Sequence, residues 1–525
     1  MVAVATMGLV IFGQTLRNEF VAFDDELLIL DNPRAHGLTW TNVRAAFTTY
    51  DPELYVPLTL VSYQAEYSLF GASSTATHAT NVVLHACNAV LVLAILRRFL
   101  SRKTALLCAL LFAVHPLTVE AVAWASGRKD LLAATFAFGS MVAFLRYRER
   151  GKGLWWSVAL FACGLLAKVS VAPVPVALVL FDWLAQRRVD VRALRSYVPH
   201  LALSIVFLVV ALLGKQAQTG NLLTPLLLSP VALSFYLRAS VLPVGLSIFY
   251  PFVDPVTIVH PWVAGGIALT AGITVACVVA LRKTRVPLGA WLLFVCFIAP
   301  SLLNVAKGGD GGLDLYFASD RYAYVALLGP LLVAGWALRD KARWALVPVI
   351  GAFAVLTIVQ AATWRTSETL FSNVIANGGG SHVAYTNLAG IMLRAGKVDA
   401  AEALYRKSLE VKPTSRALFN LARIEGATGR HDDAIGHYRA ALAERPNDAE
   451  VRSLLGSLLL MRGRVEEALP ELEAARRLRP DDASIHYNLG LIYEHLKRPA
   501  EARREFEEVL RLKPGDAQAL KKLGR

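Results

Sequence analysis

The chain has 525 residues, of which 55% are hydrophobic and only 18% are charged, and its formal net charge is +14. This composition excludes an ordinary soluble globular protein and indicates a polytopic membrane protein with a more polar C-terminal part. The positive charge does not indicate a nucleic-acid partner, because it is divided among short basic clusters between apolar segments. The five cysteines lie within apolar runs and therefore predict no disulfide framework.

Eleven apolar segments approach the roughly 20 residues that a membrane-spanning helix needs. We place them near residues 1–16, 81–98, 104–124, 130–147, 154–169, 171–186, 197–214, 262–281, 288–305, 321–338 and 345–363. Basic clusters follow every second segment, as expected of cytoplasmic loops, at 97–103, 146–152, 187–195, 282–285 and 339–343. The N-terminus is therefore predicted to be cytoplasmic, and the long loop 17–80 and the C-terminal part to lie outside.

The segment 215–261 interrupts this pattern. Its apolar run from Leu226 to Val244 contains Arg238 and Pro243, and a span here would move the cluster at 282–285 to the outer side. We therefore predict an amphipathic helix on the outer membrane interface, with Arg238 directed toward headgroups or substrate.

The first acidic motif is Phe23-Asp24-Asp25-Glu26, just after the first apolar segment. Carboxylates beside a membrane must face water or a polar cavity. An adjacent pair suits proton abstraction, because each carboxylate raises the proton affinity of the other. A solvated acidic turn that caps a short helix is an equal alternative on spacing alone. A divalent metal could also bind Asp24 and Asp25, although no third ligand is evident.

Polar residues inside the apolar segments form a second group. His78, Asn81, His85 and Asn88 share one face of a helix, which we expect to face protein or a cavity. Hydrogen bonding between helices is favoured for this stripe, with a metal site as the alternative. The next segment carries His115-Pro116 and runs outward, which predicts that Glu120 lies near the outer surface.

Cations from separated segments are predicted to gather on the outer side with the carboxylates. They are Arg128 and Lys129 in Ser126-Gly127-Arg128-Lys129-Asp130, Lys168, Arg238, and Arg321 in Asp320-Arg321-Tyr322. Any one of them could be an interfacial side chain that snorkels to the headgroups. Arginine, however, offers bidentate geometry to phosphate. Carboxylates and cations from so many places predict a site for an anionic lipid-linked substrate.

A repeat of 33 or 34 residues begins near residue 382, where hydropathy falls and charge rises. Its equivalent positions are Asn387, Asn420, Leu454 and Asn488, then Gly396, Gly429 and Gly463, then Ala401, Ala434, Ala468 and Ala502, then Pro413, Pro446, Pro480 and Pro514. This register predicts four tetratricopeptide (TPR) units in 382–525, with a connecting helix in 364–381 and the start of a capping helix at Ala517. The concave groove of such a solenoid could bind a protein or peptide, or the repeats could be a spacer.

With these motifs together, the chain resembles the transmembrane-and-TPR-containing O-mannosyltransferases. The motifs that carry the resemblance are Phe23-Asp24-Asp25 with Asn32-Pro33, the stripe from His78 to Asn88, His115-Pro116 with Glu120, Gly127-Arg128-Lys129-Asp130, Lys168, Asp320-Arg321-Tyr322 and the repeats. The resemblance implies an all-α, GT-C-like membrane bundle over 1–363, followed by a TPR α-solenoid. It also implies a lipid-phosphate sugar donor and transfer of mannose to Ser or Thr of proteins on the non-cytoplasmic side.

The composition and compact loops indicate a bacterial relative in the inner membrane, with a polyprenyl-phosphate donor and with the active site and repeats in the periplasm. Two departures from the family pattern are Val56, where an arginine is usual, and Val169, where a glutamate is favoured. The loop 306–320, with its run of glycines around Asp310, is also unusual. These departures indicate a choice of donor or acceptor that differs from that of the family.

These observations predict an inverting glycosyltransferase in which Asp24 or Asp25 is the base. The cations proposed for the departing phosphate are Arg128, Lys129, Lys168, Arg321 and Arg238, and the supporting polar residues are His78, His85, His115, Glu120 and Asp320. One alternative is a non-enzymatic membrane-anchored TPR scaffold for exported proteins. Another is a GT-C transferase that acts on a glycan or lipid acceptor.

Overall fold

The computed structural model describes residues 1–51, 54–186, 191–214, 223–302, 305–309, 312–377 and 380–524. Several positions discussed above lie outside these residues: Arg187 and Arg188, the segment 215–222, Asp310-Gly311 and Arg525. The chain forms two compact units, one of residues 1–307 and 314–379 and one of residues 380–525 with 308–313. Among the described residues, helices predominate and one two-stranded sheet is present, which confirms the all-α fold class.

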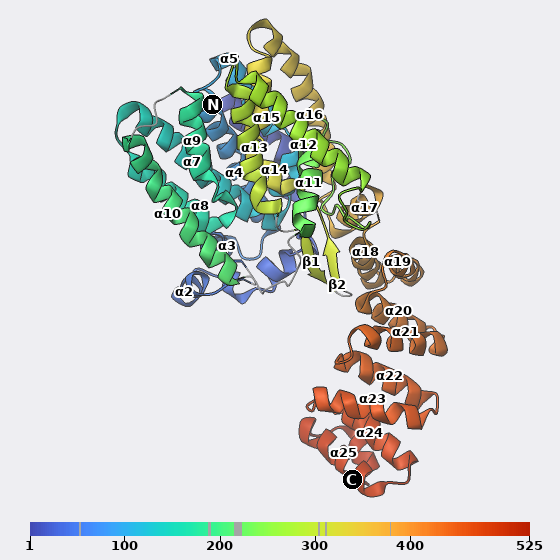
Figure 1. Cartoon of the computed structure of the whole chain (residues 1–525). Coiled ribbons are helices and arrows are strands. Elements are labelled where there is room, and N and C mark those ends of the chain that lie inside the picture. The colour runs from blue at the N-terminus through green and yellow to red at the C-terminus, as the bar shows by residue number, and fades with distance from the viewer. Residues whose placement is uncertain are drawn as a thin grey trace. The chain divides into compact units, whose positions relative to one another are not determined.

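The first unit is a helical bundle (Figure 1). Its helices are α1 (Val2–Phe12), α2 (Trp40–Thr48), α3 (Pro57–Phe70), α4 (Ser74–Leu96), α5 (Arg102–Ala113), α6 (Val119–Ala123), α7 (Arg128–Arg150), α8 (Leu154–Ala167), α9 (Val174–Leu184), α10 (Val191–Gly214), α11 (Leu223–Val241), α12 (Pro261–Ala280), α13 (Val286–Leu302), α14 (Ala323–Ala326), α15 (Leu328–Ala337), α16 (Leu346–Ala362) and α17 (Ser367–Asn377). The residues of strands β1 (Ala306–Gly309) and β2 (Gly312–Leu315) are divided between the two units.

Six of the described helices are long and apolar enough to cross a membrane. They are Ser74–Leu96, Ala125–Arg150, Ala193–Gly214, Leu223–Val241, Pro261–Ala280 and Ala342–Ala362. Helices α5 and α6 together pass the same test but are bent by 52°. The bend lies at His115-Pro116, where proline has no backbone N–H to continue a helix. The predicted span over 104–124 is therefore bent, and the predicted span 321–338 is divided into α14 and α15.

Helix α11 is long enough for a span, yet both of its halves lie at one end of the bundle. In its first half, Leu228 packs with Val263 at the start of α12 and Val305 just after α13. In its second half, the Tyr236 hydroxyl donates a hydrogen bond to the carbonyl of Ser319 over 3.1 Å. These contacts agree with an interfacial position. Exposed residues of α11 include Leu223, Leu226 and Val241, and the amphipathic character of the helix stays a prediction.

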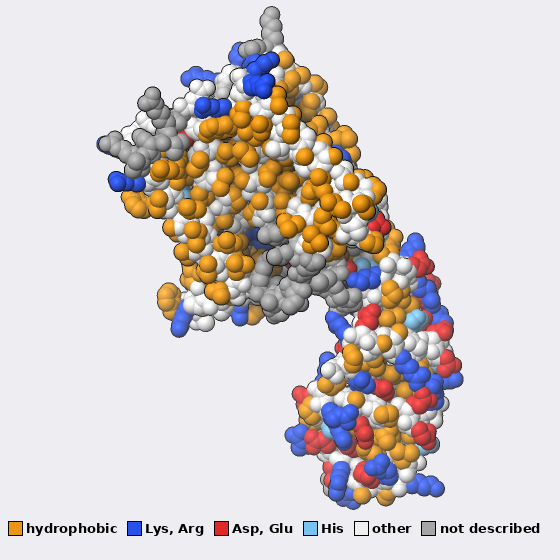
Figure 2. All heavy atoms as spheres, viewed as in Figure 1, with side chains coloured by type: hydrophobic (Ala, Val, Ile, Leu, Met, Phe, Trp, Pro, Cys, Tyr) orange, Lys and Arg blue, Asp and Glu red, His pale blue; other side chains and the backbone are white. Residues whose placement is uncertain are grey.

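The side of the bundle is largely hydrophobic in Figure 2, as expected of a surface that meets lipid. The described residues of the basic clusters converge at one end of it. Arg148, near the end of α7, pairs with the buried carboxylate of Asp182 over 2.8 Å. Arg285 donates a hydrogen bond to the carbonyl of Trp183 over 3.1 Å. This is the end that the charge pattern predicts to be cytoplasmic.

The second unit consists of antiparallel helix pairs with a short last helix (Figure 1). The helices are α18 (His382–Arg394), α19 (Val398–Val411), α20 (Ser415–Ala427), α21 (His431–Glu444), α22 (Ala449–Met461), α23 (Val465–Leu478), α24 (Ala483–His495), α25 (Pro499–Leu512) and α26 (Ala517–Lys522). Small residues are required where paired helices cross. A Cβ at Gly456 would lie 2.5 Å from the Leu472 side chain, and one at Gly490 would lie 2.5 Å from Phe506. The predicted TPR α-solenoid is confirmed.

Candidate functional site

A cavity of about 270 Å³ lies at the end of the first unit away from the basic clusters. Helix α7 begins at this cavity with Lys129 and ends among the basic residues near Arg148. Helix α8 then returns, so that Lys168 at its C-terminal end lines the same cavity. The alternation of helix direction therefore brings together charged residues that are far apart in the sequence.

One wall of the cavity is charged and includes Asp24, Lys129, Asp130, Lys168 and Arg321. The Lys168 ammonium pairs with Asp130 over 2.5 Å. The guanidinium of Arg321 pairs with the buried carboxylate of Glu120. The Lys129 ammonium instead lies 4.6 Å from the ring centroid of Trp124, a cation–π arrangement.

Another part of the cavity wall is apolar. Its lining residues are Phe207, Val210 and Ala211 of α10, Phe297 and Pro300 of α13, and Val171 and Val325. Helix α10 exposes many aliphatic side chains on its outer surface, among them Ile205 and Leu212. The loop before α3 closes over this wall, because the Tyr50 hydroxyl donates a hydrogen bond to the carbonyl of Val210 over 2.8 Å. The cavity therefore presents a charged face and an apolar face to one ligand.

The two adjacent aspartates have different surroundings. Asp24 lines the cavity and has a left-handed backbone conformation, with φ of +66°, which is uncommon outside glycine and often marks functional sites. Asp25 is fully buried and points toward the turn before α7. Its carboxylate accepts hydrogen bonds from the backbone N–H of Val21 (2.9 Å) and from both the N–H (3.0 Å) and the hydroxyl (2.6 Å) of Ser126.

Burial raises the pKa of Asp25 to about 6, while the hydrogen bonds from Ser126 and Val21 and the nearby charge of Lys129 act in the opposite direction. The two carboxylates diverge, Asp24 toward the cavity and Asp25 toward Ser126. This arrangement does not offer both side chains to a single ion. Among the residues that the structure describes, no group of three or more His, Cys, Asp or Glu side chains is placed to hold a metal.

Two of the predicted phosphate ligands lie elsewhere. Arg128 is fully buried and pairs with Glu66 over 2.8 Å, on the side of α7 that faces away from the cavity. Arg238 is exposed, stacks on Phe235 and donates a long hydrogen bond of 3.5 Å to the carbonyl of Val244. Neither residue is among those that line the cavity, so the structure does not bring them to the other predicted phosphate ligands. Lys129, Lys168 and Arg321 do line it.

The predicted supporting residues are buried around the cavity rather than within it. His85 contacts the Tyr324 hydroxyl over 2.7 Å, and His115 contacts the carbonyl of Ser240 over 3.1 Å. His78 is buried in the same stripe of α4 as His85. Asp320 accepts a hydrogen bond from the Tyr250 hydroxyl over 2.8 Å. The His85 contact joins α4 to α14, as expected of the hydrogen-bonding role favoured for the α4 stripe.

Sequence reasoning overlooked several residues of the site. Asp130, Tyr55 and Tyr322 line the cavity, although none was given a role there. Glu66 was not singled out at all. One signal could have identified it: Glu66 is the single charged residue in the 14 residues of α3, and an isolated charge among apolar residues needs a partner.

Comparison with known proteins matches two parts of the chain to family models. Residues 57–213 match the dolichyl-phosphate-mannose-protein mannosyltransferase model, and residues 386–449 and 453–517 match a tetratricopeptide repeat model. Among solved structures, a crystal structure of MamA protein is matched with 26% identity and a TM-score of 0.27, over 28% of this chain and 80% of that chain. A Pseudomonas aeruginosa pilF structure is matched with 31% identity and a TM-score of 0.25, over 27% and 65%.

Curated relatives carry the name protein O-mannosyl-transferase. TMTC3 of Mus musculus is 29% identical over 155 residues, which cover 28% of this chain and 17% of the mouse protein. TMTC1 of Mus musculus is 36% identical over 152 residues, covering 26% and 15%. TMTC4 of Mus musculus is 28% identical over 232 residues, covering 38% and 31%. The matches thus span less than a third of each relative. The two domain models and these relatives show that parts of the chain are similar to the transmembrane-and-TPR-containing O-mannosyltransferases.

Proposed function

We propose that the chain is a membrane glycosyltransferase that moves a sugar from a lipid-linked phosphate donor to a hydroxyl group of a protein. The names of its relatives suggest that this sugar is mannose. The observation that carries this proposal is the cavity with a charged wall and an apolar wall. A lipid-phosphate sugar needs both: cations for the phosphate, and apolar surface for the chain attached to it. The mannosyltransferase match over 57–213 supports the same reaction class.

In the proposed reaction the acceptor oxygen attacks the anomeric carbon from the side opposite the phosphate. The carboxylate of Asp24 takes the hydroxyl proton as the new carbon–oxygen bond forms. The bond from the anomeric carbon to the phosphate oxygen breaks, and its electron pair leaves with the lipid phosphate. Lys129, Lys168 and Arg321 stabilise that developing charge in a cavity partly closed to water. Asp25 acts as a positioning residue, because it ties the loop that carries Asp24 to Ser126.

A non-enzymatic scaffold is less well supported than the enzyme. A scaffold has no need of a carboxylate and several cations from separate helices in one cavity, whereas Asp24, Lys129 and Lys168 share one here. A transferase with a glycan or lipid acceptor is still compatible with this cavity. We further propose that the cavity and the repeats face the outer side of a bacterial inner membrane, following the basic clusters.

The test is sugar transfer by the purified full-length protein in lipid nanodiscs. Radiolabelled polyprenyl-phosphate mannose is supplied with a threonine-containing peptide, a glycan or a second lipid as acceptor, and Asp24→Asn is the matched control. We expect labelled peptide from the wild type and little from the variant. Labelling of the glycan or lipid alone would assign another acceptor. No transfer to any acceptor, with equal donor binding by both proteins, would overturn the proposed function.

For the repeats in 382–525, we propose the role of holding the protein acceptor. A linked binding module raises the local concentration of a bound partner without contributing to the chemistry. Deletion of residues 382–525 should raise the apparent KM for a protein acceptor and leave binding of the donor unchanged. Equal activity of both forms on a protein and on a short peptide would leave the repeats as a spacer.

A further inference from the structure

The segment 124–130, called the turn below, contains the connection from α6 to α7 and the first residues of α7, and it serves both sides of the bundle. On the cavity side, Lys129 lines the cavity and Ser126 holds the carboxylate of Asp25. On the other side, Arg128 points into the protein. The turn is tight, because a Cβ at Gly127 would lie only 2.3 Å from the carbonyl oxygen of Ala121. Small movements of this turn would therefore shift several cavity groups together.

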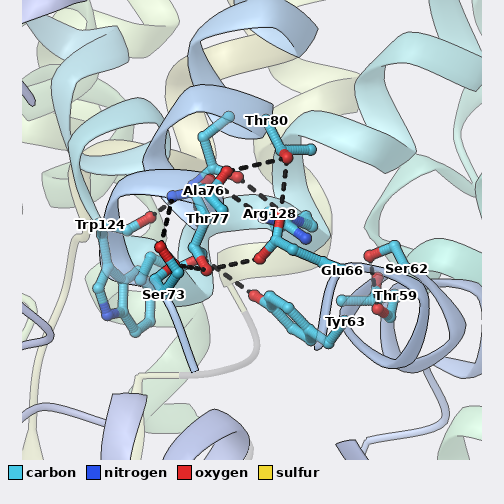
Figure 3. A network of polar contacts seen from close by, with 12 residues as sticks. Thr59, Ser62, Tyr63, Glu66, Ser73, Ala76, Thr77, Thr80, Trp124 and Arg128 are labelled. Carbon is cyan, nitrogen blue, oxygen red and sulfur yellow. Dashed lines mark hydrogen bonds and ion pairs between the residues drawn. The ribbon is translucent and has the colours of Figure 1, made fainter. Parts of the chain in front are cut away.

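A buried polar network lies behind the turn and is centred on Glu66 of α3 (Figure 3). The Glu66 carboxylate pairs with Arg128 over 2.8 Å. It also accepts hydrogen bonds from the hydroxyls of Thr77 (2.5 Å) and Thr80 (2.7 Å) of α4. The arginine in turn donates to the Thr77 carbonyl (3.0 Å) and to the Asn81 side chain (3.2 Å). Glu66 thus joins α3, α4 and the start of α7.

The same residues also hold the backbone of the turn directly. The Asn81 amide donates to the carbonyls of Trp124 (2.9 Å) and Ala125 (3.3 Å). The Tyr63 hydroxyl donates to the carbonyl of Ala125 over 3.0 Å, and the Arg128 guanidinium lies 4.6 Å from the Tyr63 ring centroid. Figure 3 shows Tyr63, Glu66 and Arg128 directed toward one another. Each planar group in this network has several partners, so its geometry is strongly constrained.

We infer that Glu66, through its ion pair with Arg128, is a positioning residue for the phosphate site, because the pair fixes the turn that presents Lys129 to the cavity. This inference rests on the proposed function. It replaces the sequence-based idea that Arg128 itself binds phosphate. Arg128 suits the positioning role because its guanidinium contacts Glu66, Thr77 and Asn81 at once, which the single ammonium of a lysine cannot do.

The direction in which Glu66→Gln changes the affinity for an anionic ligand distinguishes a positioning role from a purely electrostatic one. Glu66→Gln keeps the shape of the side chain but removes a negative charge near the cavity. If Glu66 acted only through its charge, an anionic ligand would bind more tightly to the variant, because Arg128 would no longer be neutralised. If Glu66 positions the turn, the ligand binds more weakly, because Lys129 loses its place.

The experiment measures binding of a polyprenyl phosphate without sugar to the full-length protein in nanodiscs, alongside thermal unfolding of the ligand-free protein. We expect Glu66→Gln to weaken binding about tenfold or more, the scale seen when a residue that supports a ligating group is removed. Arg128→Lys should weaken binding nearly as much, although it preserves the charge. The matched pair at the cavity should behave differently: Lys129→Arg retains binding and Lys129→Gln loses it.

Unchanged or tighter binding by a folded Glu66→Gln variant would overturn the inference, and so would full binding by Arg128→Lys. If Lys129→Gln binds as well as the wild type, the phosphate site of the proposed function fails instead, which keeps the two failures distinct. If Glu66→Gln does not fold, Thr80→Val removes one hydrogen bond to Glu66 and keeps the ion pair. A folded Thr80→Val variant should bind several times more weakly than the wild type, and wild-type binding by it would contradict the inference.

Discussion

Replacement of Asp24 and of Asp25 by asparagine, one at a time, should separate the base from the residue that holds it. Asparagine is the appropriate replacement at Asp24, because it tolerates the left-handed backbone found there. Asp24→Asn removes the proton acceptor from the cavity and leaves the hydrogen bonds of Asp25 in place. Loss of a general base lowers the rate about 10²-fold or more, which corresponds to about 2.7 kcal/mol in activation free energy. Its thermal unfolding should match that of the wild type.

Asp25→Asn acts through the structure instead. The carboxylate has three donors around it, two from Ser126 and one from Val21. An amide provides one oxygen, so its NH2 group must face a donor that it cannot satisfy. Loss of one buried hydrogen bond to a charged group costs about 1.5–3 kcal/mol. The variant should therefore unfold at a lower temperature than the wild type, and its rate should also fall because Asp24 is displaced.

The assay is transfer from a polyprenyl-phosphate sugar to a peptide at saturating donor, combined with thermal unfolding of each variant in detergent. Asp24→Asn should lose kcat with little change in donor KM, whereas Asp25→Asn should lose both rate and stability. Full activity of Asp24→Asn would refute its role as the base. A stable Asp25→Asn variant with a larger loss of kcat than Asp24→Asn would exchange the two roles.

Three further predictions concern other features of the chain. Burial raises the pKa of Asp25 from its ordinary value of 3.8 to about 6. The stability that Asp25 contributes is therefore complete below the unfolded-state pKa and is lost as the pH rises through the folded-state pKa. Between pH 4 and pH 7 the wild type should lose thermal stability relative to Asp25→Asn. The fourth repeat has Lys497 with φ of +58° where the third has Gly463 with φ of +73°, a left-handed backbone that favours glycine. Lys497→Gly should therefore stabilise the repeats by about 1 kcal/mol, and Gly463→Ala should destabilise them by a similar amount, as measured by thermal unfolding. A topology reporter fused after Arg98 should lie in the cytoplasm and one fused after Gly380 outside, and a cytoplasmic Gly380 would contradict the proposed orientation.

The parts of this protein that could be predicted from its sequence are those with a repeating signal. The repeats were predicted in register because Ala401, Ala434 and their equivalents recur at a fixed spacing and are all buried where paired helices cross. The polar stripe of α4 was predicted because its members share a helix face, and all four are buried. Periodicity gives the direction of a side chain relative to its own helix. It does not show what lies opposite.

Arg128 and Lys129 illustrate where that information ends. Adjacent residues on a helix point about 100° apart, and the sequence alone does not show which of the two meets a given cavity. The sequence favoured the arginine, because its fork suits phosphate. In the structure the Arg128 guanidinium instead contacts Glu66, which lies 62 positions earlier in the chain. Similarly, Asp24 and Asp25 are equivalent in sequence, and only the contact of Asp25 with Ser126 distinguishes them.

The charges of the first unit fall into two groups, and this division explains why sequence reasoning assigned too many ligands. An unpaired charge inside a membrane protein is costly, so charges that hold the fold together occur with partners. Glu66 pairs with Arg128, Glu120 with Arg321 and Asp130 with Lys168. Arg128 is buried by its partner, whereas Arg321 and Lys168 remain at the cavity wall while their carboxylates hold them in place. Asp24 and Lys129 line the cavity between these pairs, and they are the groups that we expect a substrate to meet first.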